Sequence, residues 1–454
     1  LRRLVRQEVN RTNNNPPVYD LEYDSVLQAA VNAINELRGK QGWPVTAVDL
    51  PTGLDADTGL PLGGCAFALP GAGAQSSSTR GRVQVHADGP PRRGHHGGRE
   101  RTPPDGAVVT EDDTITWVGA AQDVPAGIAA DRTIELAGRW LTPGLIDCHT
   151  HIVFGGQRAA EFARRTAGTS YAEIAREGGG ILNTVRATRA AGVDELVRRS
   201  EPRLRALLQE GVTTVEIKSG YGLDFDSERR MLLAARALEQ RLPVTVVTSL
   251  LAAHATPPEF KGREDDYIDL IVQQWLPRFA QEPGLIDMLD AYCESIAFSA
   301  TQCERLFAAA KAHGWPVRLH AEQISNIGGS RMAARHGAIA CDHLEYATAD
   351  DAIAMARAGT VAVLLPVAYY VLADPRLPPI DLFRAHRVPM AVASDANPGS
   401  APGASLQTAM NMARRLFGLT SDEVLEGVTR NAARALGLGD RLGRIAPGFQ
   451  ADFA

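Results

Sequence analysis

The stretch PGLIDCHTH, residues 143–151, decides how the rest of the chain is interpreted. It begins as a short apolar run and ends in Asp147-Cys148-His149-Thr150-His151, where two histidines stand two positions apart. Side chains at positions i and i+2 of an extended segment point to the same face, so both imidazoles can reach one ion. His149 and His151 are therefore candidate metal ligands at the end of a strand.

Short apolar runs recur along the rest of the chain, each followed by polar residues and then by a helical pattern, as at 194–209 and 227–240. We predict eight strands, at residues 141–149, 213–219, 244–251, 286–294, 317–320, 339–343, 360–366 and 390–395. Eight strand-then-helix units predict an α/β fold, a closed parallel (β/α)8 barrel of the TIM type. The active site of such a barrel forms where the strands end and the loops begin.

Further ligand-type side chains stand at the ends of these predicted strands. His254 follows the third strand, and His320 ends the fifth. His343 ends the sixth strand, and Asp395 ends the eighth. Neutral imidazoles together with a carboxylate suit zinc or ferrous iron, and such a site leaves a position open for water.

The other histidines receive an ordinary interpretation, because a lone histidine is more often a hydrogen-bonded structural residue than a ligand. They lie in a Gly- and Pro-rich segment or on helical segments: His86, His95, His96, His313, His336 and His386. Asp395 alone could belong to a simple turn, since the stretch SDANPG at 394–399 is rich in turn-forming residues. Its place at the end of the eighth strand favours a ligand role.

Composition limits the class of protein. The chain has 454 residues, 44% of them apolar and 22% charged, which is typical of a soluble globular protein. The net charge of −6 argues against a general nucleic-acid binder. Five cysteines without a C-x-x-C pair indicate reduced thiols, and no apolar run is long enough to span a bilayer. We expect a cytoplasmic protein with a small-molecule substrate and no nucleic-acid or membrane partner, with a homodimer as one option for its assembly.

Changes in amino-acid composition and in apolar periodicity divide the chain into segments. Residues 63–105 are dominated by Gly, Pro, Ser and Arg, a composition that predicts a linker or disorder. Residues 106–139 alternate apolar and polar positions and predict small strands. We therefore expect an N-terminal extension at 1–62, the linker at 63–105, a partial β-sandwich at 106–139, the barrel at 140–437, and a truncated return to the sandwich at 438–454.

From about residue 106 onward the chain resembles the amidohydrolase superfamily and, within it, the imidazolonepropionases of histidine degradation. Four stretches carry the resemblance: DCHTHIVFGGQR at 147–158, EIKSGYGL at 216–223, LHAEQ at 319–323 and SDANPGS at 394–400. The resemblance implies one Zn²⁺ or iron ion per chain, bound by His149, His151, His320 and Asp395.

Strand four bears on the number of metal ions. Dinuclear relatives place a carbamylated lysine there, whereas this chain has Tyr292-Cys293-Glu294, which favours one metal. Lys218 lies on the second strand instead, and we interpret it as structural, paired with Glu216 or another neighbouring carboxylate.

The family resemblance also implies a set of substrate contacts: Arg158, Tyr221, His254, Gln323, Asn397, Gly399 and Ser400. The expected substrate, 4-imidazolone-5-propionate, has a carboxylate that an arginine can bind through two parallel hydrogen bonds. Its flat ring has polar edges that Tyr, His and Gln side chains can recognise. Tyr171 is an equally plausible neighbour of the substrate.

In the expected reaction a metal-activated water attacks the ring carbonyl, and the C–N bond breaks to give N-formimidoyl-glutamate. Asp395 can accept the water proton, and His343 can orient the water or stabilise the oxyanion. Glu322 or Gln323 could steer the proton to nitrogen, and the sequence does not decide between them. Gln323 cannot titrate, so Glu322 is the candidate catalytic residue.

Two features depart from the family pattern. The sandwich of the relatives is built from both chain ends, and here both contributions look incomplete, which suggests a frameshifted or fused gene. Residues 19–62 weakly resemble part of the NAD(P)HX epimerase family, through AVDLPTGLDADTG at 47–59. The alternatives to the leading interpretation are thus another hydrolase or deaminase of a related heterocycle, or a non-functional product.

Overall fold

A computed structural model of the chain describes residues 82–88, 105–128, 130–136, 139–169 and 179–454. All eight predicted barrel strands are present in it. The expectations for residues 1–62 and for Tyr171 fall outside these ranges. The barrel strands are β5 (Leu145–Asp147), β6 (Val212–Lys218), β7 (Thr245–Ala253), β8 (Met288–Cys293), β9 (Arg318–Ala321), β10 (Ala340–His343), β11 (Val361–Leu364) and β12 (Met390–Val392). They form one sheet in sequence order, and every pair is parallel.

The first and last strands of this sheet meet just beyond their carboxyl ends. Thr150 and Ala396 form a parallel bridge there. The amide of Asp395 donates to the carbonyl of His149 at 3.0 Å, and the amide of His151 donates to the carbonyl of Ala396 at 3.0 Å. The seam between the two strands therefore joins residues from opposite ends of the barrel sequence.

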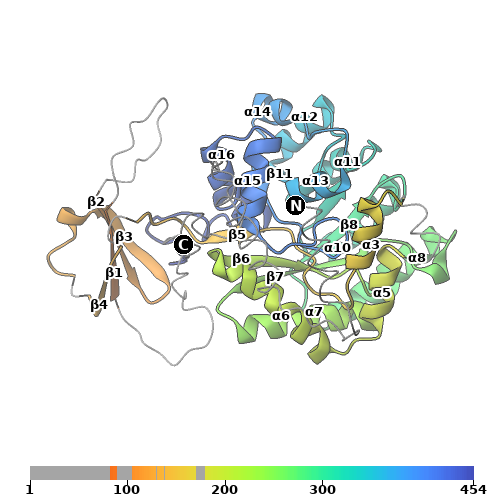
Figure 1. Cartoon of the computed structure of the whole chain (residues 1–454), viewed down its shortest axis with the longest axis horizontal. Coiled ribbons are helices and arrows are strands. Elements are labelled where there is room, and N and C mark those ends of the chain that lie inside the picture. Colours follow the sequence, from red (N-terminus) through yellow and green to blue (C-terminus); the bar gives the residue numbers. More distant parts are fainter. Residues whose placement is uncertain (1–81, 89–104, 129, 137–138, 170–178) are drawn as a thin grey trace, which may run out of the picture. The chain divides into compact units, whose positions relative to one another are not determined.

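Helices lie outside the strands, as expected for this fold (Figure 1). Between β5 and β8 the chain forms α3 (Ala159–Thr166), α5 (Ile181–Arg189), α6 (Val193–Gln209), α7 (Phe225–Arg241), η2 (Pro258–Phe260), α8 (Glu264–Leu270), η3 (Ile271–Trp275) and α9 (Leu276–Phe279). After β8 it forms α10 (Ala300–Ala312), α11 (Gly329–Arg335), α12 (Ala349–Ala358), α13 (Pro366–Leu372), α14 (Ile380–His386), α15 (Leu406–Leu416), α16 (Ser421–Gly427) and α17 (Arg430–Ala435). The helices predicted at 194–209 and 227–240 are confirmed as α6 and α7.

Sequence periodicity explains these elements. Every residue of β6 is buried, because strands of a parallel barrel are covered on both faces. In α6 the buried positions include Leu196, Ser200, Leu204 and Leu207, which lie three or four residues apart and form one face of the helix. Helix α7 begins after Asp224, whose carboxylate accepts a hydrogen bond from the amide of Ser227 at 2.7 Å.

A second, four-stranded sheet precedes the barrel in the chain. It consists of β1 (Arg82–Asp88), β2 (Asp105–Glu111), β3 (Thr114–Ala120) and β4 (Arg132–Glu135), in the order β3-β2-β1-β4, and η1 (Ala121–Asp123) follows β3. Strand β1 corrects the prediction that residues 63–105 are linker throughout. The physical reason is the alternation of polar and apolar residues in RVQVHAD, which the Gly- and Pro-rich flanks concealed.

The last residues of the chain pair with this sheet and with the segment before β5. Thr114 forms an antiparallel bridge with Gln450, and Pro143 forms one with Phe453. Phe453 is buried and belongs to a small apolar cluster with Val108 and Ile115. Residues 438–454, expected to return to the small domain, thus reach both it and the start of the barrel.

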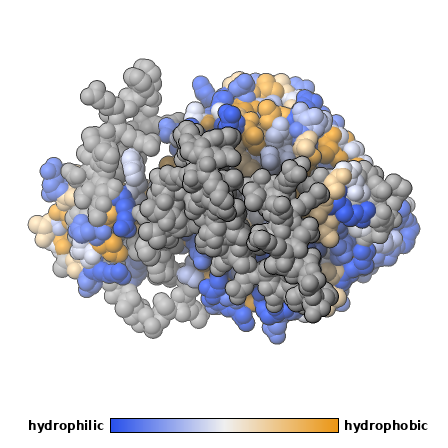
Figure 2. All heavy atoms as spheres, viewed as in Figure 1, coloured by the Kyte–Doolittle hydropathy of each residue, from blue (hydrophilic) through white to orange (hydrophobic). Residues whose placement is uncertain are grey.

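Hydrophilic side chains cover much of the described surface that faces the viewer in Figure 2, with apolar side chains gathered in smaller areas. Within the described residues, no helix combines the length and the apolar character that crossing a membrane requires. The four described cysteines, Cys148, Cys293, Cys303 and Cys341, are free and buried.

Candidate functional site

Four predicted ligands converge at the carboxyl ends of the barrel strands. The Nε2 atoms of His149 and His151 are 3.2 Å apart, and Nε2 of His320 lies 3.4 Å from Nε2 of His151. Oδ1 of Asp395 lies 3.3 Å from Nε2 of His149 and 3.5 Å from Nε2 of His151. All four residues are buried. Together with His343 we call them the histidine cluster.

Local backbone geometry brings these side chains together. His149 and His151 follow β5 in extended chain, while His320 lies within β9. Asp395 follows β12 with a φ of 52°, and His343 ends β10 with a φ of 77°. Residues other than glycine rarely adopt positive φ, and such strained residues gather at functional sites. The turn at each strand end directs the side chain towards the centre of the barrel mouth.

The tautomers of two histidines follow from their neighbours. Nδ1 of His149 lies 3.0 Å from Oδ2 of Asp342, and Nδ1 of His320 lies 3.1 Å from Oδ2 of Asp290. A carboxylate accepts hydrogen bonds, so an N–H on Nδ1 of each ring faces its carboxylate and leaves the lone pair on Nε2. Both lone pairs then face the point where the Nε2 atoms meet.

The chemistry of this donor set fits a divalent metal ion. Burial lowers the pKa of His149 and of His151 well below the usual range, so both rings are neutral near pH 7. Burial also raises the pKa of the Asp395 carboxyl to about 7, because nothing in the described structure fully offsets its desolvation. Neighbouring atoms of this set lie 3.2–3.5 Å apart, and nitrogen lone pairs and a carboxylate oxygen at such distances repel unless a cation or proton lies between them. The residues present therefore suit a metal site.

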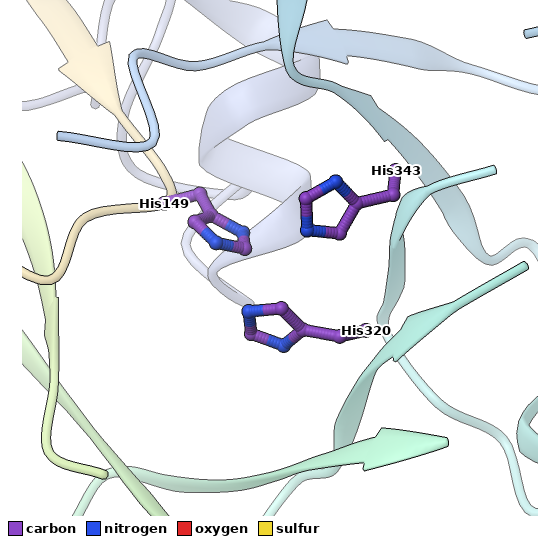
Figure 3. A group of neighbouring side chains, drawn as sticks. All are labelled: His149, His320 and His343. Atoms are coloured by element: carbon purple, nitrogen blue, oxygen red, sulfur yellow. The ribbon is translucent and has the colours of Figure 1, made fainter. Parts of the chain in front are cut away.

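His343 lies at the rim of the same cluster. Its ring centroid is 5.5 Å from that of His320 and 5.9 Å from that of His149, and the three rings point towards one another (Figure 3). These three histidines also form a group whose nitrogen atoms could hold one ion. Nδ1 of His343 is buried without a hydrogen-bond partner in the described structure. The ring therefore lies beside the four predicted ligands, and its catalytic role stays a prediction.

Three predicted substrate contacts lie on one side of the cluster. The ring of His254 stacks on that of His151, with centroids 5.3 Å apart, and its Nδ1 donates to the carbonyl of Gly220 at 3.0 Å. Tyr221 lies 5.3 Å from His254, centroid to centroid. Burial lowers the pKa of His254 to about 3, so this ring is neutral as well.

Gln323, the third of these predicted contacts, is held by Tyr292, which the sequence analysis did not predict as a site residue. The hydroxyl of Tyr292 donates to Oε1 of Gln323 at 2.7 Å. The Tyr292 ring lies 6.2 Å from that of His254 and 6.0 Å from that of His320. Tyr292 stands at the carboxyl end of β8, and its position at a strand end was the signal available in the sequence.

The remaining predicted contacts form a second group, which we call the arginine side: Arg158, Asn397, Gly399 and Ser400. Oδ1 of Asn397 accepts hydrogen bonds from the amides of Gly399 and Ser400 at 2.7 and 2.8 Å. A Cβ atom on Gly399 would lie 2.4 Å from Nη1 of Arg158, so a larger residue there would displace the guanidinium from its present position. Arg158 is held from behind by Glu161, with Nε donating to Oε2 at 2.8 Å.

Glu322, predicted to assist proton transfer, is not brought to the cluster. Its carboxylate accepts hydrogen bonds from the amides of Gly329 and Ser330, at 2.8 and 2.9 Å, and so caps the start of α11. Its φ of 50° turns it away from the direction of its neighbour in the strand. Burial raises the pKa of this carboxyl to about 7. The hydrogen bonds at the start of α11 favour a structural role for Glu322, and its catalytic role stays a prediction.

Lys218 has the structural role that the sequence predicted. Its Nζ lies 2.7 Å from Oε1 of Glu216 and 2.8 Å from Oδ2 of Asp290, and all three side chains are fully buried. Asp290, Arg318 and Asp342 were not predicted as part of the site. The signal that could have identified them is an ionisable residue inside a predicted buried strand, where an isolated charge is costly.

Comparison with known proteins agrees with this geometry. The model of the Amidohydrolase family matches residues 157–454. The chain is 56% identical over 356 residues to the imidazolonepropionase of Pseudomonas entomophila (strain L48), covering 78% of this chain and 88% of that protein. It is 56% identical over 357 residues to the imidazolonepropionase of Pseudomonas aeruginosa (strain PAO1), covering 79% and 88%.

Among solved structures, the crystal structure of 5-methylcytosine deaminase from Klebsiella pneumoniae has the same fold, with a TM-score of 0.61 at 15% identity, over 82% of this chain and 90% of that one. The metal-binding donor set, the eight-stranded barrel and the extent of the sequence identity lead to one conclusion: the chain belongs to the imidazolonepropionase family of the amidohydrolases.

Proposed function

We propose that this chain hydrolyses 4-imidazolone-5-propionate to N-formimidoyl-L-glutamate, a ring-opening step of histidine breakdown. The observation that carries the proposal is that Nε2 of His151 lies within 3.5 Å of ligand atoms of His149, His320 and Asp395, in a chain 56% identical to imidazolonepropionases. The histidine cluster supplies the metal ligands, and the arginine side supplies an anion-binding group.

The metal in this proposal is a single Zn²⁺ or iron ion per chain, held by His149, His151, His320 and Asp395. When bound, such an ion supplies Lewis acidity, which lowers the pKa of a coordinated water from about 16 to about 7. A single ion is supported by the absence of a lysine on β8, where the sequence is MLDAYC.

Asp395 is placed to handle the proton of the attacking water. Its carboxylate lies beside His149 and His151, and it is the only carboxylate whose oxygen comes within 3.5 Å of both Nε2 atoms among the described residues. The water oxygen bonds to the ring carbonyl carbon while Asp395 takes the proton. The ring C–N bond then breaks, and Asp395 returns that proton to the departing nitrogen.

His343 is placed to act on the carbonyl oxygen. Burial lowers the pKa of His343 well below the usual range, so its ring is neutral. A neutral imidazole carries one N–H group, which can donate a hydrogen bond to the carbonyl oxygen. Its position beside His149 and His320 lets it stabilise the negative charge that develops on the oxygen during attack.

The two sides of the site divide recognition of the substrate. Arg158 binds the propionate carboxylate through its guanidinium, and Asn397 holds the Gly399–Ser400 backbone beside it. Tyr221, His254 and Gln323 contact the polar edges of the ring. Gln323 can offer its amide nitrogen to the substrate because Tyr292 already donates to its oxygen.

Purified protein tests the proposal directly. Addition of 4-imidazolone-5-propionate to the metal-loaded protein should remove the ultraviolet absorbance of the ring and release no ammonia. Loss of absorbance accompanied by stoichiometric ammonia would instead indicate a deaminase. Well-folded, metal-loaded protein that leaves the absorbance unchanged would overturn the proposal.

A further inference from the structure

A network of buried charges lies directly against the metal ligands. It consists of two cations and three carboxylates, each with a side chain that is fully buried: Lys218, Arg318, Glu216, Asp290 and Asp342. The residues come from β6, β8, β9 and β10, so the network spans half of the barrel. Buried charges on this scale are costly to desolvate, and a role in the site would account for them.

Two of the carboxylates make direct contact with metal ligands. Oδ2 of Asp342 lies 3.0 Å from Nδ1 of His149, and the oxygens of Asp290 lie 3.1 and 3.2 Å from Nδ1 of His320. Each contact is on the ring nitrogen opposite the one that faces the other ligands. A hydrogen bond at that nitrogen fixes both the rotation of the ring and the position of its proton.

Each of these carboxylates is itself held by a cation. Arg318 binds Asp342 with two nitrogens, Nε at 3.1 Å and Nη2 at 2.8 and 2.9 Å, and its Nη1 donates to the carbonyl of Cys148 at 2.8 Å. Lys218 donates to Asp290 at 2.8 Å and to Glu216 at 2.7 Å. Cys148 immediately precedes His149, so Arg318 supports both the ring of this histidine and the backbone next to it.

The third histidine provides an internal contrast. His151 contributes its Nε2 to the cluster, but its Nδ1 is buried without a hydrogen-bond partner in the described structure. Its ring is positioned by stacking on His254 instead. Carboxylates therefore orient His149 and His320, whereas packing orients His151. Each carboxylate contact can be removed by mutation without changing the His151 contacts.

We propose that Asp290 and Asp342 are positioning residues that hold His320 and His149 in the Nδ1–H tautomer, with Lys218 and Arg318 keeping both carboxylates in place. The Nε2 lone pairs are thereby directed at the metal before it binds. This inference rests on the metal-dependent function proposed above, and it assigns the buried network to metal affinity and not only to folding.

A purely structural ion cluster makes a different prediction. Neutralising one of its carboxylates would lower the stability of the fold, but it would leave the affinity of the folded protein for metal unchanged. Carboxylates that accept a hydrogen bond from a metal-bound histidine instead contribute about 10- to 100-fold to metal affinity. Metal affinity measured on folded protein, without substrate, separates the two roles.

The experiment compares Asp290→Asn and Asp342→Asn with a matched control, Asp351→Asn. Asp351 is also buried, but its contacts are structural: it accepts from the amide of Thr348 and from Nδ2 of Asn326, both at 2.7 Å. Metal-free proteins that pass a circular-dichroism check are titrated with Zn²⁺ against a chromogenic chelator. We expect Zn²⁺ affinity to fall about 10- to 100-fold in the first two variants and to stay within about twofold of wild type in the control.

Wild-type Zn²⁺ affinity in both Asp290→Asn and Asp342→Asn would overturn the proposal. An equal loss in the Asp351→Asn control would also overturn it, because the effect would then be general to buried carboxylates. Neither result depends on turnover, so a failure of the proposed catalytic function remains distinguishable.

A second measurement applies if the two variants do not fold. Long-range ¹H–¹⁵N spectra of metal-free wild type, labelled with ¹⁵N at histidine and assigned with His149→Asn and His320→Asn, report the tautomer of each ring. We expect both rings to carry the proton on Nδ1. An Nε2–H tautomer at both positions would contradict the proposal.

Discussion

The two sides of the site are built in different ways. The histidine cluster is held by charged side chains that project from strands into the barrel interior, as where Asp342 and Arg318 support His149. The arginine side is held by short-range contacts within loops, as where Asn397 accepts from two amides only two and three residues away. The difference predicts that the proposed metal binding depends on the barrel itself, whereas the proposed substrate contacts can be altered with less effect on the fold.

Removal of a metal ligand should have the largest effect. We expect His149→Ala to lower turnover by more than about a thousandfold, or about 4 kcal/mol of transition-state stabilisation, because both the metal and its activated water are lost. Metal content by elemental analysis and the imidazolone absorbance check this. Full metal content with more than about a tenth of the activity would contradict the role given to His149.

Breaking the buried network should weaken the fold next most strongly. Lys218→Met leaves Glu216 and Asp290 buried without their shared cation, so we expect the free energy of unfolding to fall by about 3–5 kcal/mol. Denaturant titration of the metal-free protein measures it. The control is Arg205→Met, which breaks an exposed pair with Glu201 and should cost about 0–1 kcal/mol. An equal loss of unfolding free energy in the two variants would show that the buried pairs of Lys218 stabilise the fold no more than an exposed pair.

Substitution on the arginine side should affect substrate binding and leave the metal in place. We expect Arg158→Met to raise KM by about 10- to 100-fold, with kcat changed far less, because a charged hydrogen-bond partner of the substrate carboxylate is lost. A substrate analogue without the propionate group should be insensitive to the substitution. An equal loss with that analogue would show that Arg158 does not bind the carboxylate.

Glu322→Gln should have the smallest effect on chemistry. Because the carboxylate of Glu322 caps α11, we expect kcat to change by less than about fivefold, whereas loss of a general acid or base would cost about 10²- to 10⁴-fold. Steady-state kinetics across pH 6–9 would decide. A fall in kcat of about 100-fold would instead show that Glu322 acts in catalysis.

Most of the barrel could be predicted because its signal is local. Each strand is a short apolar run, and every predicted run overlaps a strand of the structure, from Leu145–Asp147 to Met390–Val392. Strand β1 was missed because seven alternating residues stand between long Gly- and Pro-rich stretches, where composition outweighs periodicity.

The site was predictable only in part, and the reason is spatial. His149, His151, His320 and Asp395 lie at or just beyond the carboxyl ends of strands, and these ends meet at one mouth, so their proximity follows from the fold. Sequence order could not show that the Glu322 side chain turns to the start of α11, because the turn depends on a backbone φ of 50°.

The buried network was harder still to predict. Asp290, Arg318 and Asp342 are single charges in apolar strands, and only the assembled sheet shows that they are neighbours on the adjacent strands β8, β9 and β10.

The central claim is that one metal ion, held by the histidine cluster, drives opening of the imidazolone ring. Titration of metal-free protein with Zn²⁺ or Fe²⁺, followed by the loss of imidazolone absorbance, tests it most directly. We predict that turnover rises linearly with added metal and reaches its plateau at one equivalent per chain. Turnover by rigorously metal-free protein, or none at any metal loading of folded protein, would contradict the claim.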